Sequence, residues 1–398
     1  MNADRPTLRL KPKVDARKIR WGFPWVYNND IVWDRRSKAI EAGTIVTLQD
    51  SDRGDLATAT VNIASKLAVR ILDRDIIARI DQDWITGKVQ AAWTLRQRLY
   101  DAPFFRLIHA EGDGLPGVIV DVFGEYAVLQ ANAVWADQRK MELARAIQSV
   151  TGIGNIFLNG TGRSRQAEGL EDLRTPLIGH GPDQPVPVVM NGATYLADIT
   201  GGQKTGLFYD QRPNHCFAKG LSKGASVLDV FCHVGGFGLA AMAGGAASVD
   251  FVDASDPALE LARQGGFWTS GTDALTFHKG DAFDQMARMA EDGRRFDMVV
   301  CDPPAFAPSK TALEKGLRAY EKVARQAADL VMPGGYLVLC SCSHAATLDK
   351  FRNSCLRGIG RAERGGRLIH QGAAGGDHPQ HLSLADGGYL KALFFVLD

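Results

Sequence analysis

The chain has 398 residues, of which 45% are hydrophobic and 23% are charged, as in soluble globular proteins of two or three domains. No apolar run reaches membrane-spanning length, and residues 1–10 lack the apolar core of a signal peptide, so we expect a cytoplasmic protein that contacts no membrane. All six cysteines lie beyond residue 215 without C-x-x-C spacing, which argues against zinc and against a disulfide framework. We therefore expect no metal.

The net charge of +1 is unevenly distributed along the chain. Residues 1–40 hold ten Lys/Arg against four Asp/Glu, a surplus of six, so the remaining residues sum to −5. Basic and aromatic side chains occur together in this region, at Lys11, Lys13, Arg17, Lys18, Arg20, Trp21, Phe23, Trp25 and Tyr27. Cations neutralise phosphates and rings stack on bases, so the stretch indicates RNA binding. The alternative is a solvated arm followed by core aromatics, and we expect Trp25 to lie in the core.

Residues 44–72 alternate apolar and polar positions in short runs that are separated by turn residues. This pattern predicts a small β-barrel built from hairpins. We assign it to an N-terminal domain, 1–74.

Residues 75–190 are expected to form a middle domain of mixed α and β structure. The expected elements are a helix over 74–100, a hairpin of strands 117–121 and 126–131, a helix over 136–150, a strand over 155–158 and a loop or linker over 172–188. Arg163 and Arg165 could contact phosphate or lie exposed.

A third domain, 191–398, contains a glycine-rich turn between a predicted strand and a predicted helix. The run Val227-Leu228-Asp229-Val230 predicts the strand, and Gly235, Gly236 and Gly238 lead into an Ala-rich helix. Ligands of open α/β sheets bind outside the carboxyl ends of the strands, where glycine lets the backbone approach closely. The spacing differs from G-x-G-x-x-G, so the glycines alone do not establish nucleotide binding.

Acidic residues close three successive predicted strands in this domain. Asp253 stands 24 residues after Asp229, and Asp281 follows the third strand. Asp253 is placed to accept hydrogen bonds from both ribose hydroxyls of a nucleoside, and Asp281 could hold an adenine amino group. Each acid alone could instead be a helix cap or turn residue, but the three together favour a nucleoside site.

The fourth predicted strand, 296–301, runs directly into Asp302-Pro303-Pro304. Two prolines stop both strand and helix and fix a rigid loop at the edge of the sheet. This D-P-P sequence resembles the fourth motif of the class I S-adenosylmethionine (SAM) methyltransferases, which have a Rossmann-like α/β fold. The resemblance implies that Asp302 and the following backbone hold the amino group and ring nitrogen of a nucleobase or amide substrate.

The fifth predicted strand, 335–340, is followed by Ser341-Cys342-Ser343. A thiolate is a good nucleophile, and its attack on carbon 6 of cytosine enables carbon 5 to take a methyl group. Most free cysteines are instead small buried hydrophobes, but the position beside the D-P-P loop favours a nucleophile. Cys301 is expected in the core, because strand alternation points it away from Asp302.

Several motifs together resemble the PUA-domain-containing class I methyltransferases that form 5-methylcytosine in large-subunit (23S) ribosomal RNA. They are Phe23-Pro24-Trp25-Val26-Tyr27, Glu111-Gly112-Asp113-Gly114-Leu115-Pro116-Gly117, Gly202-Gln203-Lys204-Thr205-Gly206, Asp210-Gln211-Arg212, Asp377-His378-Pro379 and the motifs above. The resemblance implies an N-terminal PUA-like RNA-binding barrel, a C-terminal Rossmann-like domain that converts SAM to S-adenosylhomocysteine, and Cys342 as the nucleophile.

The resemblance and the strand-end positions together give the expected site residues. For the cofactor they are Lys204, Thr205, Asp210, Asp229, Phe231, Gly235, Gly236, Asp253, Ala254, Ser255, Asp281, Ala282 and Asp302. For the RNA they are Pro303, Pro304 and Phe306, with Lys11, Lys13, Arg17, Lys18 and Arg20 at the front of the chain. The catalytic pair is Cys342 and Asp302.

The chain departs from the family pattern at Ala305, where lysine is common, and at Cys232-His233-Val234, where a Ser-Tyr-Thr sequence is usual. Two other functions stay open at this point. One is methylation of a purine amino group or of guanine N7, which needs no thiol, and the other is a non-catalytic RNA-binding assembly factor. The sequence also leaves open a homodimer, the target nucleotide and the base that removes the carbon-5 proton.

Overall fold

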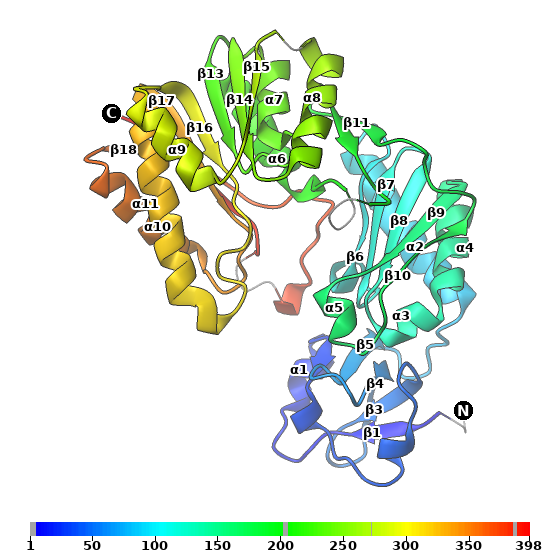
Figure 1. The fold of residues 1–398 in the computed structure, drawn as a ribbon. Helices are drawn as coiled ribbons and strands as arrows, with labels where there is room; N and C mark the ends of the chain where they lie inside the picture. The colour runs from blue at the N-terminus through cyan, green and yellow to red at the C-terminus, as the bar shows by residue number, and fades with distance from the viewer. Residues whose placement is uncertain (1–4, 202–205, 272, 385–387) are drawn as a thin grey trace. The chain divides into compact units, whose positions relative to one another are not determined.

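The computed structural model describes residues 5–201, 206–271, 273–384 and 388–398. The chain forms two compact units, shown as a ribbon in Figure 1. Unit 1 comprises Met1–Gln184, Ile199–Gly206 and Gly376–Asp386, and unit 2 comprises Pro185–Asp198, Leu207–Gly375 and Gly387–Asp398. A short segment near the carboxyl end of the chain therefore belongs to the N-terminal unit.

Unit 1 begins with a five-stranded sheet of order β1-β3-β4-β5-β2. Its elements are β1 (Thr7–Arg9), α1 (Ala16–Arg20), β2 (Trp25–Val26), β3 (Ile45–Gln49), β4 (Asp55–Val61) and β5 (Val69–Asp73). The antiparallel pairing of β3 with β4 and of β4 with β5 confirms the expected hairpins. Leu10, Val46 and Val69 are fully buried in the core of this half-barrel.

A second five-stranded sheet in unit 1 has the order β10-β9-β8-β7-β6. Its elements are α2 (Gln82–Leu99), β6 (Phe104–His109), β7 (Val118–Phe123), β8 (Tyr126–Ala131), α3 (Val134–Gln138), α4 (Lys140–Thr151), β9 (Asn155–Gly160), α5 (Arg163–Gln166) and β10 (Leu173–Ile178). Val89 of α2 and Leu143 of α4 belong to the same buried cluster as Val120 of β7. This arrangement confirms the middle α+β region and its β7–β8 hairpin.

The structure corrects three boundaries that were expected in this region. The helix expected from residue 74 starts at Gln82, because Asp81 accepts a hydrogen bond from the Trp84 N–H and caps the helix there. The single helix expected over 136–150 is two helices, α3 and α4, that meet at Arg139. Strand β10 occupies part of the expected loop, where it pairs with β9.

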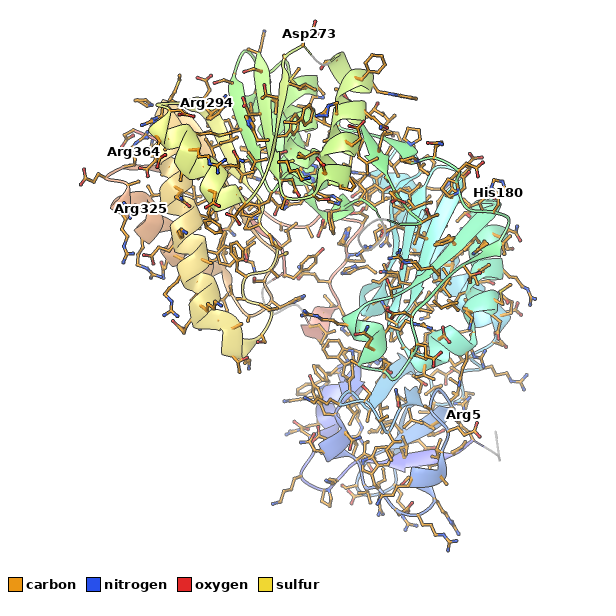
Figure 2. All side chains as sticks on the ribbon, viewed as in Figure 1. Arg5, His180, Asp273, Arg294, Arg325 and Arg364 are labelled. Atoms are coloured by element: carbon orange, nitrogen blue, oxygen red, sulfur yellow. The ribbon has the colours of Figure 1, made fainter. Side chains whose placement is uncertain are left out.

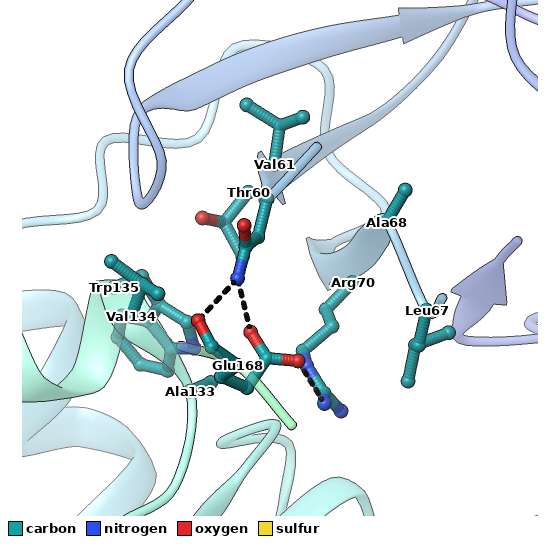
Figure 3. Close-up of a pocket in the computed structure, with 10 residues that line it drawn as sticks. Thr60, Val61, Leu67, Ala68, Arg70, Ala133, Val134, Trp135 and Glu168 are labelled. Atoms are coloured by element: carbon teal, nitrogen blue, oxygen red, sulfur yellow. Dashed lines mark hydrogen bonds and ion pairs between the residues drawn. The ribbon is translucent and has the colours of Figure 1, made fainter. Parts of the chain in front are cut away.

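Two basic side chains of unit 1 hold its fold together through buried contacts. Arg165 is 3% exposed and donates to Asp137 Oδ1 and to the Ala131 carbonyl, so it is a structural residue rather than a phosphate contact. In the hollow of Figure 3, Arg70 of β5 donates to Glu168 Oε1 at 3.0 Å, and Asn62 donates to Glu168 Oε2 at 3.0 Å. The buried Glu168 carboxylate, paired in this way, joins the first sheet of unit 1 to the segment that follows α5.

Unit 2 is built on a hairpin and a seven-stranded sheet of order β15-β14-β13-β16-β17-β19-β18. Its elements are β11 (Val186–Met190), β12 (Ala193–Ala197), α6 (Arg212–Leu221), β13 (Ser226–Val230), α7 (Gly236–Ala243), β14 (Ser248–Asp253), α8 (Asp256–Ser270), β15 (Leu275–Lys279), α9 (Ala282–Glu291), β16 (Phe296–Cys301), α10 (Leu313–Leu330), β17 (Val331–Ser341), α11 (Leu348–Arg361), β18 (Gly366–Gly372) and β19 (Lys391–Leu397). Figure 1 shows helices on both faces of this sheet.

The five neighbouring strands β15, β14, β13, β16 and β17 are parallel, and β19 lies antiparallel between β17 and β18. The strand order reverses between β13 and β16, which is the position where doubly wound sheets bind ligands at their carboxyl ends. The Rossmann-like fold class is therefore confirmed, and β16 has the expected bounds.

The long helices of unit 2 end on specific contacts. At the carboxyl end of α10, Arg364, labelled in Figure 2, donates to the carbonyls of Ala328 (3.1 Å) and Val331 (2.8 Å). The Ala328 carbonyl also accepts from the Val331 N–H, so the guanidinium adds to the backbone bond that ends α10. Within the part of the chain that the structure describes, no helix has the length and hydrophobicity needed to cross a membrane.

Candidate active site

The turn after β13 presents strained backbone at the switch point of the sheet. Phe231, His233 and Gly235 all have left-handed conformations, with φ of 62°, 50° and 86°. Such a conformation costs a non-glycine residue about 1–3 kcal/mol and persists where the surroundings hold it. A Cβ atom on Gly238 would collide with the Phe251 ring, so glycine at this position allows α7 to pack closely on β14.

Asp229 lies near the end of β13 and is 1% exposed. Its Oδ2 atom accepts a hydrogen bond from the Gly238 N–H at 2.7 Å, whereas Oδ1 has no hydrogen-bond partner among the described residues. Burial, with a contribution from the charges of Asp302 and Asp253, raises the pKa of this carboxyl to about 8. A cationic group at Oδ1 would compensate the buried charge. SAM carries an ammonium and a sulfonium group, so the residues at this position fit the cofactor.

The acids that close β14 and β15 both contact backbone N–H groups. Asp253 Oδ2 accepts from the His233 N–H at 2.9 Å, and its Oδ1 accepts from the Ser255 N–H at 2.8 Å. Each carboxylate oxygen offers two lone pairs, so Asp253 keeps capacity for ribose hydroxyls. Asp281 is exposed and caps α9 through bonds from the Phe283 and Asp284 N–H groups. Asp281 therefore performs the capping role that the sequence left open.

Asp302, after β16, is held by a short chain of buried amides. Gln211 Nε2 donates to Asp302 Oδ2 at 2.9 Å, and Asn214 Nδ2 donates to Gln211 Oε1 at 2.6 Å. Gln211 and Asn214 are 3% and 0% exposed, so the carboxylate has a fixed orientation. The neighbouring Asp210, which was expected to contact the cofactor, accepts a hydrogen bond from the Tyr389 hydroxyl at 2.6 Å.

Cys342 follows β17, which pairs in parallel with β16, the strand that precedes Asp302. Its side chain is half-buried. The flanking hydroxyls anchor the loop: Ser341 Oγ donates to Tyr320 Oη at 2.9 Å, and Ser343 Oγ lies 2.7 Å from the same oxygen. Ser343 Oγ also accepts from the Ala307 N–H at 3.0 Å, which ties the Cys342 loop to the loop that begins at Asp302.

The other cysteines have different surroundings. Cys301 is 0% exposed, as expected for a core residue, and burial holds the pKa of its thiol well above the usual range. Cys232, Cys340 and Cys355 are also buried, and Cys216 is exposed on α6. Cys342 is therefore the half-buried cysteine at the carboxyl edge of the sheet.

Aromatic rings pack beside the D-P-P loop. The Phe306 ring lies 6.2 Å from the Phe231 ring and 5.0 Å from the Tyr320 ring, so it connects the turn after β13 with the helix that anchors the Cys342 loop. Pro303 is buried and Pro304 is exposed. Of these two prolines, only Pro304 presents its ring to solvent.

The remaining expected cofactor residues occupy varied positions. Gly236 is the first residue of α7, and its carbonyl accepts from the Tyr195 hydroxyl at 3.1 Å. Ala254 is exposed, Ser255 caps α8, and Ala282 is buried at the start of α9. Lys204 and Thr205 lie outside the described residues.

Sequence reasoning missed Gln211, Tyr320 and Lys391. Lys391 is 4% exposed, and its ammonium donates to the carbonyls of Ser343 (2.7 Å) and Ala346 (2.8 Å) in the Cys342 loop. A lysine at the start of an otherwise apolar closing strand was the sequence signal that could have identified it.

The basic stretch of unit 1 lies at the surface. Lys11, Lys13, Arg17, Lys18 and Arg20 are all exposed. Two of them have carboxylate partners, Arg17 with Asp15 at 3.1 Å and Arg20 with Asp50 at 2.6 Å. Trp21 (74%) and Tyr27 (45%) are exposed.

Two aromatic residues of the same stretch are half-buried rather than exposed. The Trp25 indole donates from Nε1 to Glu111 Oε1 at 2.9 Å, and the Phe23 ring packs edge-on against Trp25. The core position expected for Trp25 is thus confirmed only in part. Trp21 and Tyr27 remain the rings that could stack on bases.

Comparison with known proteins identifies the fold and the family of the chain. A family model described as S-adenosylmethionine-dependent methyltransferase matches residues 163–363, and a PUA-like domain model matches residues 8–74. The crystal structure of SMU.776 complexed with SAH superposes with a TM-score of 0.82, covering 98% of this chain and 99% of that chain at 18% identity. A structure from Streptococcus mutans, described as a SAM-dependent methyltransferase, gives 0.81, covering 98% and 100% at 18% identity. At this identity the two structures establish the fold.

Curated relatives match along almost the whole chain. Ribosomal RNA large subunit methyltransferase I of Shewanella denitrificans is 32% identical over 390 residues, which cover 97% of this chain and 98% of the relative. The protein of the same name from Klebsiella pneumoniae is 31% identical over 373 residues, which cover 92% of each chain. The chain is thus a SAM-dependent enzyme with a PUA-like domain, and it belongs to the ribosomal RNA large subunit methyltransferase I family.

Proposed function

We propose that the protein transfers a methyl group from SAM to carbon 5 of a cytosine in 23S ribosomal RNA. One observation carries the proposal: Cys342 and Asp302 follow adjacent parallel strands, and Ser343 ties their two loops together. A nucleophilic thiol is needed to activate carbon 5 of cytosine, whereas methylation of a purine amino group or guanine N7 has no use for it. The names of the relatives support large-subunit ribosomal RNA as the substrate.

In the proposed reaction, the target cytosine leaves its base stack and enters the site, as base-modifying enzymes generally require. The Cys342 thiolate adds to carbon 6, while the Asp302 carboxyl, in its protonated form, donates its proton to N3 and accepts from the exocyclic amino group, which makes carbon 6 more electrophilic. SAM, when bound, supplies the electrophilic methyl group that carbon 5 receives. A base then takes the carbon-5 proton, the Sγ–carbon 6 bond breaks, and the double bond and the thiolate are restored.

Asp302 can perform this role because its orientation is fixed. Gln211 occupies one carboxylate oxygen, so Asp302 is held in place before the base arrives. Preorganisation of this kind supplies binding without a reorganisation cost at the moment of reaction.

The cofactor would lie along the carboxyl ends of β13, β14 and β15. Asp229 would face a cationic group of SAM, and Asp253 would accept hydrogen bonds from the ribose hydroxyls. Phe231 and the backbone of Gly235 and Gly236 would line the turn beside it. Asp281 would have to accept from the adenine amino group while it also caps α9. The remaining proposed contacts are Lys204, Thr205, Asp210, Ala254, Ser255 and Ala282.

The other parts of the chain would bind and present the RNA. The exposed lysines and arginines of residues 11–20 would contact phosphates, and Pro303, Pro304 and Phe306 would shape the base pocket. We place the functional domains at 1–74, 75–190 and 191–398, in a cytoplasmic enzyme that could act as a homodimer.

Mass spectrometry of ribosomal RNA nucleosides tests the proposal. A strain that lacks the protein should lose one 5-methylcytidine from its 23S RNA, and the parent protein should restore it. Cys342→Ala should not restore it, whereas Cys216→Ala, at an exposed cysteine of the same unit, should. Restoration by Cys342→Ala would exclude the covalent scheme, and an unchanged nucleoside profile in the deletion strain would favour the assembly factor.

A further inference from the structure

Lys391 opens β19 directly beside the Cys342 loop. In the antiparallel register of β17 and β19, it is the partner of Ser341, the residue before Cys342. Its Nζ atom donates to the Ser343 and Ala346 carbonyls, so two of its three N–H donors hold the backbone on the far side of Cys342. The side chain therefore spans the loop that carries the thiol.

The charge of this ammonium is poorly compensated. The side chain is 4% exposed, and no carboxylate of the described residues lies within 4 Å of Nζ. An unpaired buried charge is costly, and the two carbonyl dipoles compensate only part of it. Burial lowers the pKa of Lys391 to about 8, and the Cys342 thiolate acts in the opposite direction. An anion at Cys342 thus stabilises the buried cation, and the reverse follows from reciprocity.

Other titratable groups around the loop do not replace this pairing. Tyr320 of α10 donates to or accepts from serine hydroxyls, and burial raises its pKa, with the Cys342 charge adding to the rise. The pKa of His344 is lowered by the partial burial of its ring and by the charge of Lys391. The negative charge of Asp302 contributes to the raised pKa of Cys340, because it repels a thiolate. Lys391 is the cation among these groups.

We propose that Lys391 is a positioning residue whose buried ammonium fixes the Cys342 loop and stabilises Cys342 as the thiolate. The inference rests on the proposed function, because it assigns the charge a use in the attack on carbon 6. The Cys342 Sγ–H proton passes to solvent, and Lys391 keeps its own protons, two of which remain on the carbonyls. The enzyme would then hold a larger fraction of reactive thiolate at neutral pH than a free cysteine does.

The test measures the pH dependence of Cys342 alkylation by iodoacetamide, with the modified peptide quantified by mass spectrometry. In the parent protein, the apparent pKa of Cys342 should lie below about 8.5, the value of a free cysteine. Lys391→Met should raise this pKa and lower the alkylation rate at pH 7 about tenfold for each unit of rise. Cys216, exposed on α6, is the internal reference in each sample.

Tyr320→Phe separates charge from loop position. It removes the hydroxyl that bridges Ser341 and Ser343 and leaves every charge in place, so the apparent pKa of Cys342 should stay near that of the parent protein. An equal rise in both variants, or no rise in Lys391→Met, overturns the inference. A parent pKa at or above 8.5 overturns it without any variant. None of these readouts uses RNA methylation, so failure of the proposed function is recognised separately, from Cys342→Ala.

Discussion

Gln211 donates a hydrogen bond of 2.9 Å to Asp302, although the two residues are 91 positions apart in the chain. Gln211 ends the turn before α6, and Asp302 follows β16, so the bond connects a segment outside the sheet with the fourth parallel strand. Because Asn214 in turn fixes the Gln211 amide, the carboxylate reaches one defined orientation. The acid that we propose binds the substrate is thus positioned by residues that lie well before it in the sequence.

Replacement of Gln211 by Leu should lower the rate of methyl transfer. The substitution removes a hydrogen bond to a charged acceptor, worth about 1.5–3 kcal/mol, which corresponds to about 10- to 150-fold in rate if Asp302 loses its orientation. The measurement is transfer of labelled methyl from SAM to RNA. Gln264→Leu on the exposed surface of α8 is the matched control and should keep the parent rate. An undiminished rate in Gln211→Leu would show that Asp302 needs no support.

Binding of SAM should release a proton near neutral pH. The free carboxyl of Asp229 has a pKa of about 8, so at pH 7 it is mostly protonated. A cationic ligand group beside it favours the ionised form and lowers the pKa, and the proton then passes to the buffer. Calorimetry in buffers of different ionisation enthalpy measures this release directly.

The matched pair of variants for this prediction is Asp229→Asn and Asp273→Asn. The first removes the buried carboxyl and should abolish the proton release, whereas the second removes an exposed carboxyl and should leave it unchanged. Heats of SAM binding that do not depend on the buffer in the parent protein would contradict the assignment of Asp229 to the cofactor.

Two glycines should respond in opposite ways to substitution by alanine. At Gly238 a Cβ atom meets the Phe251 ring, so Gly238→Ala should lower the free energy of unfolding by about 1–3 kcal/mol through overpacking. At Gly360, in α11, nothing lies within 4 Å of a Cβ atom, and Gly360→Ala should raise it by about 0.5–1 kcal/mol. Urea unfolding measures both values. Equal stability of the two variants would contradict the close approach of α7 to β14.

The basic stretch should contribute to RNA affinity through phosphates rather than bases. Lys13→Ala and Lys18→Ala should each reduce the slope of log affinity against log salt concentration by about 0.7–0.9 for a phosphate contact. The loss should be similar for RNAs of different sequence. Lys223→Ala, exposed before the amino end of β13, is the control and should leave the slope unchanged. Unaltered slopes in the first two variants would remove residues 11–20 from the RNA-binding surface.

The fold class could be predicted from the sequence because β13, β14 and β16 are short, largely apolar runs that lead into a glycine turn or an acid. The expected strand 296–301 matches β16 to the residue. The predicted boundaries of helices and strands were wrong where local sequence signals compete. Asp81 caps α2 only because Trp84 follows in helical geometry, and β10 forms only because β9 offers it a partner. Proline and glycine in 172–188 gave no sign of that pairing.

The candidate site could be predicted only as far as single strand ends reveal it. Asp229, Asp302 and Cys342 stand at or near such ends, and their strand-end positions together with the family resemblance predicted one common site. Gln211 contacts a residue 91 positions away, Tyr320 contacts residues at least 21 positions away, and Lys391 contacts residues at least 45 positions away. No local sequence pattern encodes such contacts. The motif Asp210-Gln211-Arg212 predicted a cofactor contact for Asp210 and no role for Gln211, whereas the structure shows that the buried Gln211 amide holds Asp302.

The central claim is that Cys342 forms a covalent bond with carbon 6 of the target base, and RNA that carries 5-fluorocytidine tests it most directly. Fluorine at carbon 5 cannot leave as a proton does, so after methyl transfer the Sγ–carbon 6 bond should persist. We expect a stable protein–RNA adduct that forms only with SAM present and that maps to Cys342 by mass spectrometry. Absence of any adduct, in a preparation that methylates the unmodified RNA at full rate, would contradict the covalent mechanism.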